Sequence, residues 1–312
     1  MYAIDVRLNM REGAPSRSDL DRIADWILLF PVPPEARELR RFPYGELLLH
    51  RRGRKGASGA DAEPVVTDLP NSAGSRVAFA HVRHDTSTFE LLTLARKLVA
   101  VSTKRKAESL GVAVVGFAAS DRERLAEAIL SAAYAAAARM PNFKRKPDRS
   151  AGPKRIELHG VKPAHGFRRT RAEAEGNALA RHLSLLPSNR LTPTAYVKIL
   201  KEMSAKYGWK FEFLDMKALA RQKAGAFLAV AQGSPVPDAG IACLRYRPPR
   251  GTRAAKARAL ALVGKGICYD TGGVNLKTQR HMYGMHGDMQ GSAVALGALL
   301  ALTELGFPQP IE

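Results

Sequence analysis

Cysteine is scarce in this chain of 312 residues, which contains only Cys243 and Cys268. Two cysteines cannot form a disulfide framework, so we expect a reducing compartment and place the protein in the cytoplasm. Long apolar runs are missing as well: the nearest, Gly291–Leu302, is shorter than the roughly 18 residues that a membrane-spanning helix needs. The N-terminal stretch Met1–Gly13 lacks the uninterrupted apolar core of a secretory signal. Hydrophobic residues at 46% exclude a wholly disordered chain.

Acidic residues are few relative to basic ones, and the formal net charge is +20. Residues 1–150 carry +7, residues 151–260 carry +14 and residues 261–312 carry −1. An excess of this size is compatible with contact to a polyanion, and it is equally compatible with a coding bias that favours arginine. The segment 141–169 holds nine Lys or Arg against two acids, and reads either as a solvated connector with a few short strands or as an arm that binds RNA or DNA.

Alternating strand and helix patterns predict a smaller N-terminal α/β domain over residues 1–140. The expected helices are 16–30, 86–100 and 121–139, and the expected strands are 44–50, 76–82 and 111–117, with a loop at 51–64. Residues 141–170 form the basic connector between this domain and the next.

A second α/β domain is expected over residues 171–312, with a mostly parallel central sheet. Its expected helices are 171–186, 194–207, 216–221 and 290–305, and its expected strands are 210–214, 226–230, 239–246 and 259–267. The sequence shows no internal repeat.

Motifs for nucleotide phosphates are absent, since neither G-x-x-x-x-G-K-[ST] nor G-x-G-x-x-G occurs, and His-Glu-x-x-His is also missing. The informative stretch is instead Leu262–Ala293, LVGKGICYDTGGVNLKTQRHMYGMHGDMQGSA. A buried strand delivers Lys265 and Asp270 to a glycine turn, and Lys277 and Asp288 follow. Carboxylates and lysines gathered at the C-terminal edge of an α/β sheet are consistent with bound divalent cations. A lysine beside such cations can act as a neutral amine ligand.

The strings KGICYDTGGVNLK and DMQGSA resemble the signature region of the leucyl aminopeptidase (cytosol aminopeptidase) family, which are two-metal exopeptidases. ALARHLSLLPSNRLTPTAY and GAFLAVAQGS resemble further parts of that family, so the resemblance covers about residues 170–312. It implies a hydrolase that removes N-terminal residues from peptides, with two Mn²⁺ or Zn²⁺ ions as cofactors and a hexameric assembly.

The resemblance also implies a role for each site residue. Lys265, Asp270 and Asp288 correspond to metal ligands, with Asp270 bridging both ions. Lys277 corresponds to the catalytic lysine that polarises the scissile carbonyl, and Met285 to a wall of the pocket for the N-terminal side chain. The cations would activate a bridging water and stabilise the developing charge.

Each of these residues also has a simpler interpretation. Asp270 could be a turn residue, Asp288 a helix N-cap, Lys277 a surface lysine and Met285 a core methionine. His286 stands where the family usually has lysine, and could be an extra ligand, a residue that supports a ligand, or neither. His281 is expected in a loop, and Cys268 as a small packed side chain.

The family's later segment N-T-D-A-E-G-R, which supplies further ligands and an arginine, does not occur in these residues. We therefore expect a truncated catalytic domain, part of a longer protein, that is inactive alone. The leading hypothesis is a metal-dependent aminopeptidase acting on peptides. The alternatives are a basic nucleic-acid-binding protein with a degenerate peptidase region, and a structural subunit of a homo-oligomer.

Overall fold

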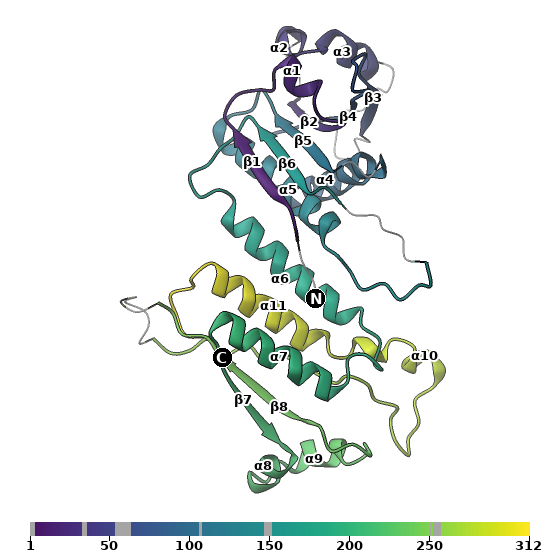
Figure 1. Ribbon diagram of the computed structural model, residues 1–312, viewed down its shortest axis with the longest axis vertical. Helices are drawn as coiled ribbons and strands as arrows, with labels where there is room; N and C mark the ends of the chain where they lie inside the picture. Colours follow the sequence, from purple (N-terminus) through teal and green to yellow (C-terminus); the bar gives the residue numbers. More distant parts are fainter. Residues whose placement is uncertain are drawn as a thin grey trace. The chain divides into compact units, whose positions relative to one another are not determined.

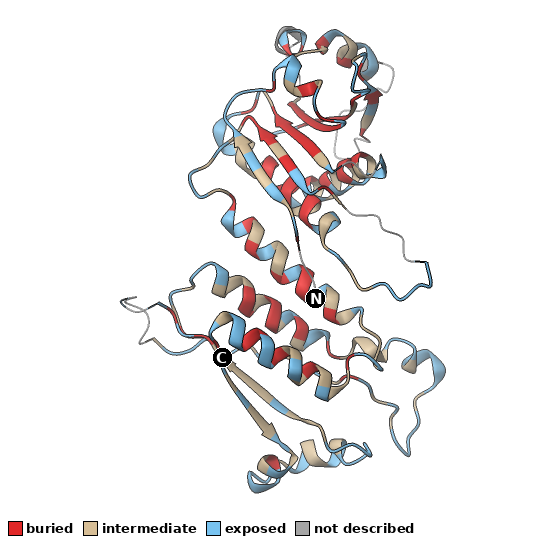
Figure 2. Ribbon diagram, in the orientation of Figure 1, coloured by how far each residue is buried: buried red, intermediate tan, exposed pale blue. Residues whose placement is uncertain are grey.

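The computed structural model describes residues 4–32, 36–53, 64–105, 108–146, 152–249, 251 and 257–312. The chain divides into two compact units (Figure 1). The first unit consists of Ala3–Arg139 and Phe143–Ala174, and the second is mainly Glu175–Glu312. Each unit has its own buried cluster of hydrophobic side chains (Figure 2).

A six-stranded sheet with the order β1-β6-β5-β2-β4-β3 forms the centre of the first unit. All neighbouring strands are parallel except β3, which is antiparallel to β4. The strands are β1 (Arg7–Arg11), β2 (Asp25–Pro31), β3 (Val65–Asp68), β4 (Arg76–Val82), β5 (Ser109–Val114) and β6 (Arg155–His159). The central strands β2, β4 and β5 are buried along nearly their whole length, as expected for strands covered on both faces.

Helices cover both faces of this sheet. They are α1 (Arg17–Leu20), α2 (Ala36–Arg41), α3 (Gly45–Gly53), α4 (Thr88–Ser102) with the 3-10 turn η1 (Thr103–Arg105), and α5 (Ala119–Ala137). Trp26, Leu28 and Phe30 of β2 pack in one cluster with residues of α1, α2 and α3. Leu29, which points to the other face, lies beside residues of α4 and α5. The first unit is therefore a three-layer α/β domain, in agreement with the α/β class that the sequence predicts.

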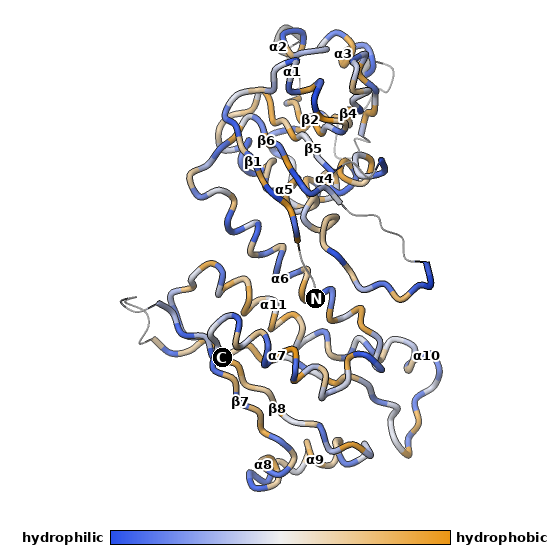
Figure 3. Tube along the Cα trace, viewed as in Figure 1, coloured by the Kyte–Doolittle hydropathy of each residue, from blue (hydrophilic) through white to orange (hydrophobic). Residues whose placement is uncertain are grey.

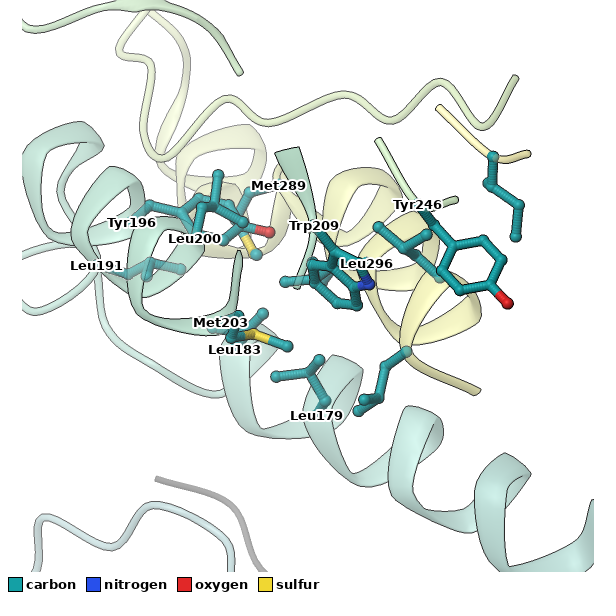
Figure 4. Close-up of a cluster of buried hydrophobic side chains, with 14 of the residues drawn as sticks. Leu179, Leu183, Leu191, Tyr196, Leu200, Met203, Trp209, Tyr246, Met289 and Leu296 are labelled. Atoms are coloured by element: carbon teal, nitrogen blue, oxygen red, sulfur yellow. The ribbon is translucent and has the colours of Figure 1, made fainter. Parts of the chain in front are cut away.

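The second unit packs helices around a two-stranded antiparallel sheet, β7-β8. Helix α6 (Arg168–Ser184) belongs to this unit from Glu175 onwards. The other elements are α7 (Pro193–Tyr207), β7 (Lys210–Asp215), α8 (Met216–Arg221), α9 (Gly225–Ala231), β8 (Gly240–Arg245), α10 (Gln279–Met282), the 3-10 turn η3 (Met285–Gly287) and α11 (Gln290–Glu304). Figure 4 shows the core, where Leu183 of α6, Met203 of α7 and Leu296 of α11 meet around Trp209.

Two glycines allow α6 and α11 to approach each other closely. A Cβ atom added to Gly297 of α11 would lie 2.5 Å from the carbonyl oxygen of Gly176 in α6, and the reverse substitution meets the oxygen of Gly297. Both glycines are buried. The contact holds α11, which starts two residues after Asp288, in a fixed position against the core.

The α/β class is confirmed, and so are most elements of the sequence prediction. Strand 76–82 coincides with β4, and helices 86–100, 194–207 and 290–305 correspond to α4, α7 and α11. The hydrophobic stretches of α11 stand out along the chain (Figure 3). None of the helices in the described part of the chain combines the length and the apolar character that crossing a membrane requires.

Several short elements were predicted wrongly. The helix expected over 16–30 ends at Leu20, and its remainder is the buried strand β2, because Trp26–Phe30 is a continuous apolar run. The segments 44–50 and 226–230 were expected as strands and are helical, in α3 and α9. Short apolar runs fit either structure, and the neighbouring packing decides between them. Of the loop expected at 51–64, residues 54–63 lie outside the described residues, and residues 51–53 complete α3.

Two expectations about the sheets are also corrected. Within the segment 141–170, read as a connector, residues Arg155–His159 form the internal strand β6, which lies between β1 and β5. In the second unit the strand pair is antiparallel, where mostly parallel strands were predicted. Residues 259–267 are extended but lack a ladder along their length, with a single bridge from Leu260 to Ile311. Residues 147–151 of the basic segment lie outside the described residues.

Candidate active site

A sharp turn in the second unit brings two of the predicted site residues, Asp270 and Lys277, together. The extended chain that carries Lys265 and Asp270 reverses at Gly272 and Gly273, whose φ angles are +89° and +66°. Residues that carry a Cβ atom rarely adopt such φ angles. A Cβ atom at Gly272 would also collide with the carbonyl oxygen of Asn275. The two glycines therefore form the turn that leads to Lys277.

Asp270 and Lys277 form an ion pair across this turn. The Lys277 ammonium donates to Asp270 Oδ2 at 2.7 Å, and the backbone N–H of Gly272 donates to Asp270 Oδ1 at 2.7 Å. The hydrogen bond from Lys277 contributes most, and that from Gly272 next, to holding the pKa of the Asp270 carboxyl below its usual range. Asp270 thus stabilises the turn and also holds the lysine.

Met285 lies against the same lysine. The Lys277 Nζ atom is 3.2 Å from Met285 Sδ, which makes the sulfur a weak acceptor for the ammonium group. The Lys277 side chain is 26% exposed. The residue predicted to polarise the substrate is therefore fixed by a carboxylate and a thioether, and is neither a free surface lysine nor a core residue.

Lys265 and Asp288 form the second pair of the site. Lys265 Nζ lies 3.2 Å from Asp288 Oδ2, across 23 positions of sequence. The backbone N–H of Ser292 in the first turn of α11 donates to the Lys265 carbonyl oxygen at 2.9 Å. This bond attaches the start of α11 to the extended chain that carries Lys265.

The N-cap interpretation of Asp288 is not supported by the geometry of α11. The capping residue of this helix is Met289, and no side chain accepts a capping hydrogen bond there. The carboxylate of Asp288 instead faces Lys265. The structure thus brings Lys265 to Asp288, and Lys277 to Asp270 and Met285.

The other residues discussed from the sequence lie around these pairs. His281 was expected in a loop and lies in α10, where Nδ1 is 3.1 Å from Thr278 Oγ1. His286 lies in η3 and takes part in neither ion pair. Cys268 is buried in the hydrophobic core, and this burial raises the pKa of its thiol to about 11.

Sequence reasoning missed one contact that supports the site. The hydroxyl groups of Tyr196 in α7 and Ser292 in α11 lie 3.1 Å apart, and Ser292 Oγ also donates to the Met289 carbonyl oxygen at 2.7 Å. Burial raises the pKa of the Tyr196 phenol to about 12, so it stays protonated. The two residues are 96 positions apart, and nothing in their local sequence patterns could indicate the contact.

The carboxylates of this site are of the type that divalent cations bind, but they are too few to hold a cation firmly. Carboxylate oxygens are the ligands that hard divalent cations prefer, and Asp270 and Asp288 supply them. Within the described ranges, however, no group of three or more His, Cys, Asp or Glu side chains is placed to hold a metal ion. In this structure each carboxylate is balanced by a lysine.

Comparison with known families assigns residues 178–312 to a peptidase domain. They match the model of the cytosol aminopeptidase family, catalytic domain. The probable cytosol aminopeptidase of Ralstonia pickettii is 38% identical over 189 residues, covering 59% of this chain and 37% of that protein. The probable cytosol aminopeptidase of Synechococcus elongatus is 34% identical over 200 residues, covering 64% of this chain and 40% of that protein.

Solved structures show the same fold. A mutant of tomato leucine aminopeptidase superposes with a TM-score of 0.78 at 21% identity, covering 98% of this chain and 61% of that one. The bottromycin maturation enzyme BotP in complex with Mn gives a TM-score of 0.67 at 20% identity, covering 93% of this chain and 58% of that one.

The class that these findings define is thus an α/β protein in which residues 178–312 resemble a peptidase catalytic domain. More specifically, residues 178–312 are similar to the catalytic domain of the cytosol aminopeptidase family, as are the matching parts of the curated relatives. The matched part of the chain spans about 37–40% of the length of these curated relatives. The comparisons favour this family over the nucleic-acid-binding and structural alternatives.

Proposed function

We propose that this chain contributes to a metal-dependent aminopeptidase that releases N-terminal amino acids from peptides. The observation that carries the proposal is the pairing of Lys265 with Asp288 and of Lys277 with Asp270 inside the segment that matches the family. These two pairs supply two carboxylates and two amines, which are the groups that the resemblance implies for the site.

In this proposal Lys265, Asp270 and Asp288 hold divalent cations, Mn²⁺ or Zn²⁺. When bound, such cations lower the pKa of a coordinated water and stabilise negative charge on a substrate oxygen. Mn²⁺ is present in the structure of BotP, which shares this fold. The two described carboxylates are too few for two firmly held ions, so the 312-residue chain should show negligible activity alone.

Lys277 is proposed as the electrophile that binds the scissile carbonyl. Its ammonium group is held by Asp270 and Met285 beside the ligand side chains. Its hydrogen bond to the carbonyl oxygen would strengthen as negative charge develops, so the lysine would act mainly on the transition state. Met285, which contacts Lys277, is proposed to line the pocket for the N-terminal side chain.

The cellular setting remains a proposal drawn from the family. We propose a cytoplasmic protein that assembles as a homo-oligomer, a hexamer as in the family, and that takes peptides as its partners. Size measurement of the purified full-length protein by light scattering would test the assembly, with a monomer contradicting it.

Two variants of the full-length protein that contains this segment test the division of roles. Lys277→Ala should lower kcat about 10²–10³-fold while the metal content stays the same. Lys265→Ala should lower metal content, because it removes a ligand. Arg280→Ala serves as the control, since Arg280 is an exposed residue of α10 outside both ion pairs.

The measurements are metal stoichiometry and the hydrolysis of a leucine anilide. If Lys277→Ala lost metal while Lys265→Ala kept it, the two roles would be reversed. Brisk metal-dependent hydrolysis by the 312-residue chain alone would contradict the proposed need for further ligands.

A further inference from the structure

The first turn of α11 packs directly against the backbone that carries Lys265. The N–H of Ser292 donates to the Lys265 carbonyl oxygen at 2.9 Å. A Cβ atom added to Gly264 would lie 2.4 Å from the Ser292 Cα atom, and one added to Gly266 would lie 3.3 Å from Ser292 Oγ. The glycines on either side of Lys265 therefore let the backbone of α11 approach, and Ser292 lies where the two segments meet.

The hydroxyl group of Ser292 connects this junction to Asp288. Ser292 Oγ lies 2.7 Å from the carbonyl oxygen of Met289, which can only accept a hydrogen bond. Met289 is fully buried and follows Asp288 directly in the chain. Through its backbone and its side chain, Ser292 thus contacts the segments that carry both members of the Lys265–Asp288 ion pair.

Tyr196 binds the Ser292 hydroxyl from a different helix, α7. Its phenolic oxygen lies 3.1 Å from Ser292 Oγ, and its side chain belongs to the same core cluster as Met289 (Figure 4). Burial raises the pKa of this phenol to about 12, so the group keeps its proton at neutral pH. The Ser292 hydroxyl has one proton to donate. Both hydroxyl protons are used only if Tyr196 donates to Ser292 and Ser292 donates to Met289.

This series of two hydrogen bonds starts from a firmly packed position. Leu200 and Met203, which follow Tyr196 in α7, are buried in the same core cluster. Hydrogen bonds in series polarise each other, so the Met289 carbonyl is held more firmly than by an isolated hydroxyl. A shift of this carbonyl would move the adjacent Asp288 relative to Lys265.

We propose that Tyr196 and Ser292 are positioning residues that set the separation of Lys265 and Asp288 and thereby increase the cation affinity of the site. The inference rests on the proposed function only in taking these two residues as cation ligands. Substituting a residue that orients a metal ligand typically lowers metal affinity about 10–100-fold. Because Tyr196 and Ser292 act through the backbone, we expect the lower end of this range.

The first measurement uses the 312-residue chain and needs no cation. Hydrogen exchange of the Ser292 amide reports on the junction, because this N–H donates to the Lys265 carbonyl oxygen. In Tyr196→Phe this amide should exchange roughly fivefold faster or more, relative to the amide of Leu300 in the same helix. A general loss of stability would instead accelerate both amides by the same factor.

Two matched variants isolate the effect of losing a buried hydroxyl group in the same unit. Tyr246 belongs to the same core cluster, and its hydroxyl donates to the Phe307 carbonyl oxygen at 3.0 Å. Ser204 of α7 is buried, and its Oγ donates to the Leu200 carbonyl oxygen at 2.7 Å. Tyr246→Phe and Ser204→Ala remove comparable hydrogen bonds that do not lead to the ion pair. Neither should accelerate the Ser292 amide selectively.

The second measurement uses the full-length protein that contains this segment and determines its affinity for Mn²⁺ by calorimetry. Tyr196→Phe and Ser292→Ala should each weaken Mn²⁺ binding about tenfold. The double variant should bind little more weakly than Ser292→Ala alone, because both residues act through one series of hydrogen bonds. The two matched variants should bind Mn²⁺ as the unsubstituted protein does.

Three results would overturn the proposal. These are equal acceleration of the Ser292 and Leu300 amides in Tyr196→Phe, equal Mn²⁺ affinity of Tyr196→Phe and Tyr246→Phe, and additive losses of affinity in the double variant. An unsubstituted full-length protein that bound neither Mn²⁺ nor Zn²⁺ would contradict the proposed function instead. The exchange of the two amides would then decide alone whether Tyr196 positions the junction.

Discussion

The contact between Gly176 and Gly297 gives a quantitative test of how α6 and α11 are held together. The substitution Gly176→Ala places a methyl group against the carbonyl oxygen of Gly297, at a distance that no real Cβ atom shows. The obstacle is backbone, so no side chain can rotate away. The two helices must separate, or the variant must distort locally.

Two opposing terms set the expected size of the effect. Alanine in a helix interior is favoured over glycine by about 0.5–1 kcal/mol. Overpacking a well-filled interface costs typically about 1–3 kcal/mol. The steric cost dominates because the facing atom is fixed, and we expect Gly176→Ala to lower the free energy of unfolding by about 0.5–2 kcal/mol.

Urea unfolding of Gly176→Ala, Gly297→Ala and the double variant completes a thermodynamic cycle. Once the first methyl group has separated the helices, the second meets less resistance, so the double variant should lose less stability than the sum of the two. Val294→Ala, at an exposed position of α11, should be neutral or slightly stabilising. A gain in stability for Gly176→Ala, or strict additivity in the cycle, would refute the close crossing.

Three further predictions concern single side chains. Burial raises the pKa of the Asp25 carboxyl, whose oxygens have no hydrogen-bond partner among the described residues. This group therefore stabilises the folded state at acid pH, and that contribution is lost as the pH rises above the ordinary aspartate pKa of about 4. Asp25→Asn should flatten this decline and raise the free energy of unfolding at pH 7, and identical pH profiles of the two proteins would contradict the prediction. Ser87→Ala removes the hydroxyl that accepts from the Glu90 N–H and should cost about 1 kcal/mol in thermal unfolding. Tyr196→Phe removes the hydroxyl contact with Ser292 and should cost about 0.5–1.5 kcal/mol, and ultraviolet titration should lose one phenol with a pKa of about 12.

Long elements with clear end signals could be predicted from the sequence. Helix α4 begins at a Ser87–Glu90 capping box, and α7 has Thr192 as N-cap with Pro193 in its first turn. These signals are local, so no knowledge of the tertiary structure is needed to interpret them. The segments that became α3 and α9 carry only short apolar runs, for which the packing partners decide between helix and strand.

The site shows the same division between local and long-range information. The Asp270–Lys277 pair depends on a turn of a few residues, whose glycines are visible in the sequence. The contact of Tyr196 with Ser292 depends on how α7 packs against α11, which no local pattern reports. Short strands were expected in the basic segment, but the place of Arg155–His159 inside the first sheet could not be predicted locally, because its two partners, β1 and β5, lie far away in the sequence.

The position of β6 has a consequence for the order in which the protein folds during synthesis. In the six-stranded sheet β1 pairs only with β6, and Leu8 lies opposite Ile156. Among the described strands of this sheet, β1 is therefore synthesised before the others and has no partner until β6, which is synthesised after them. Pairings over such distances form slowly, because a long loop must close first. During that interval Arg7 and Arg11 keep the waiting strand charged at both ends, which discourages it from pairing with a neighbouring chain.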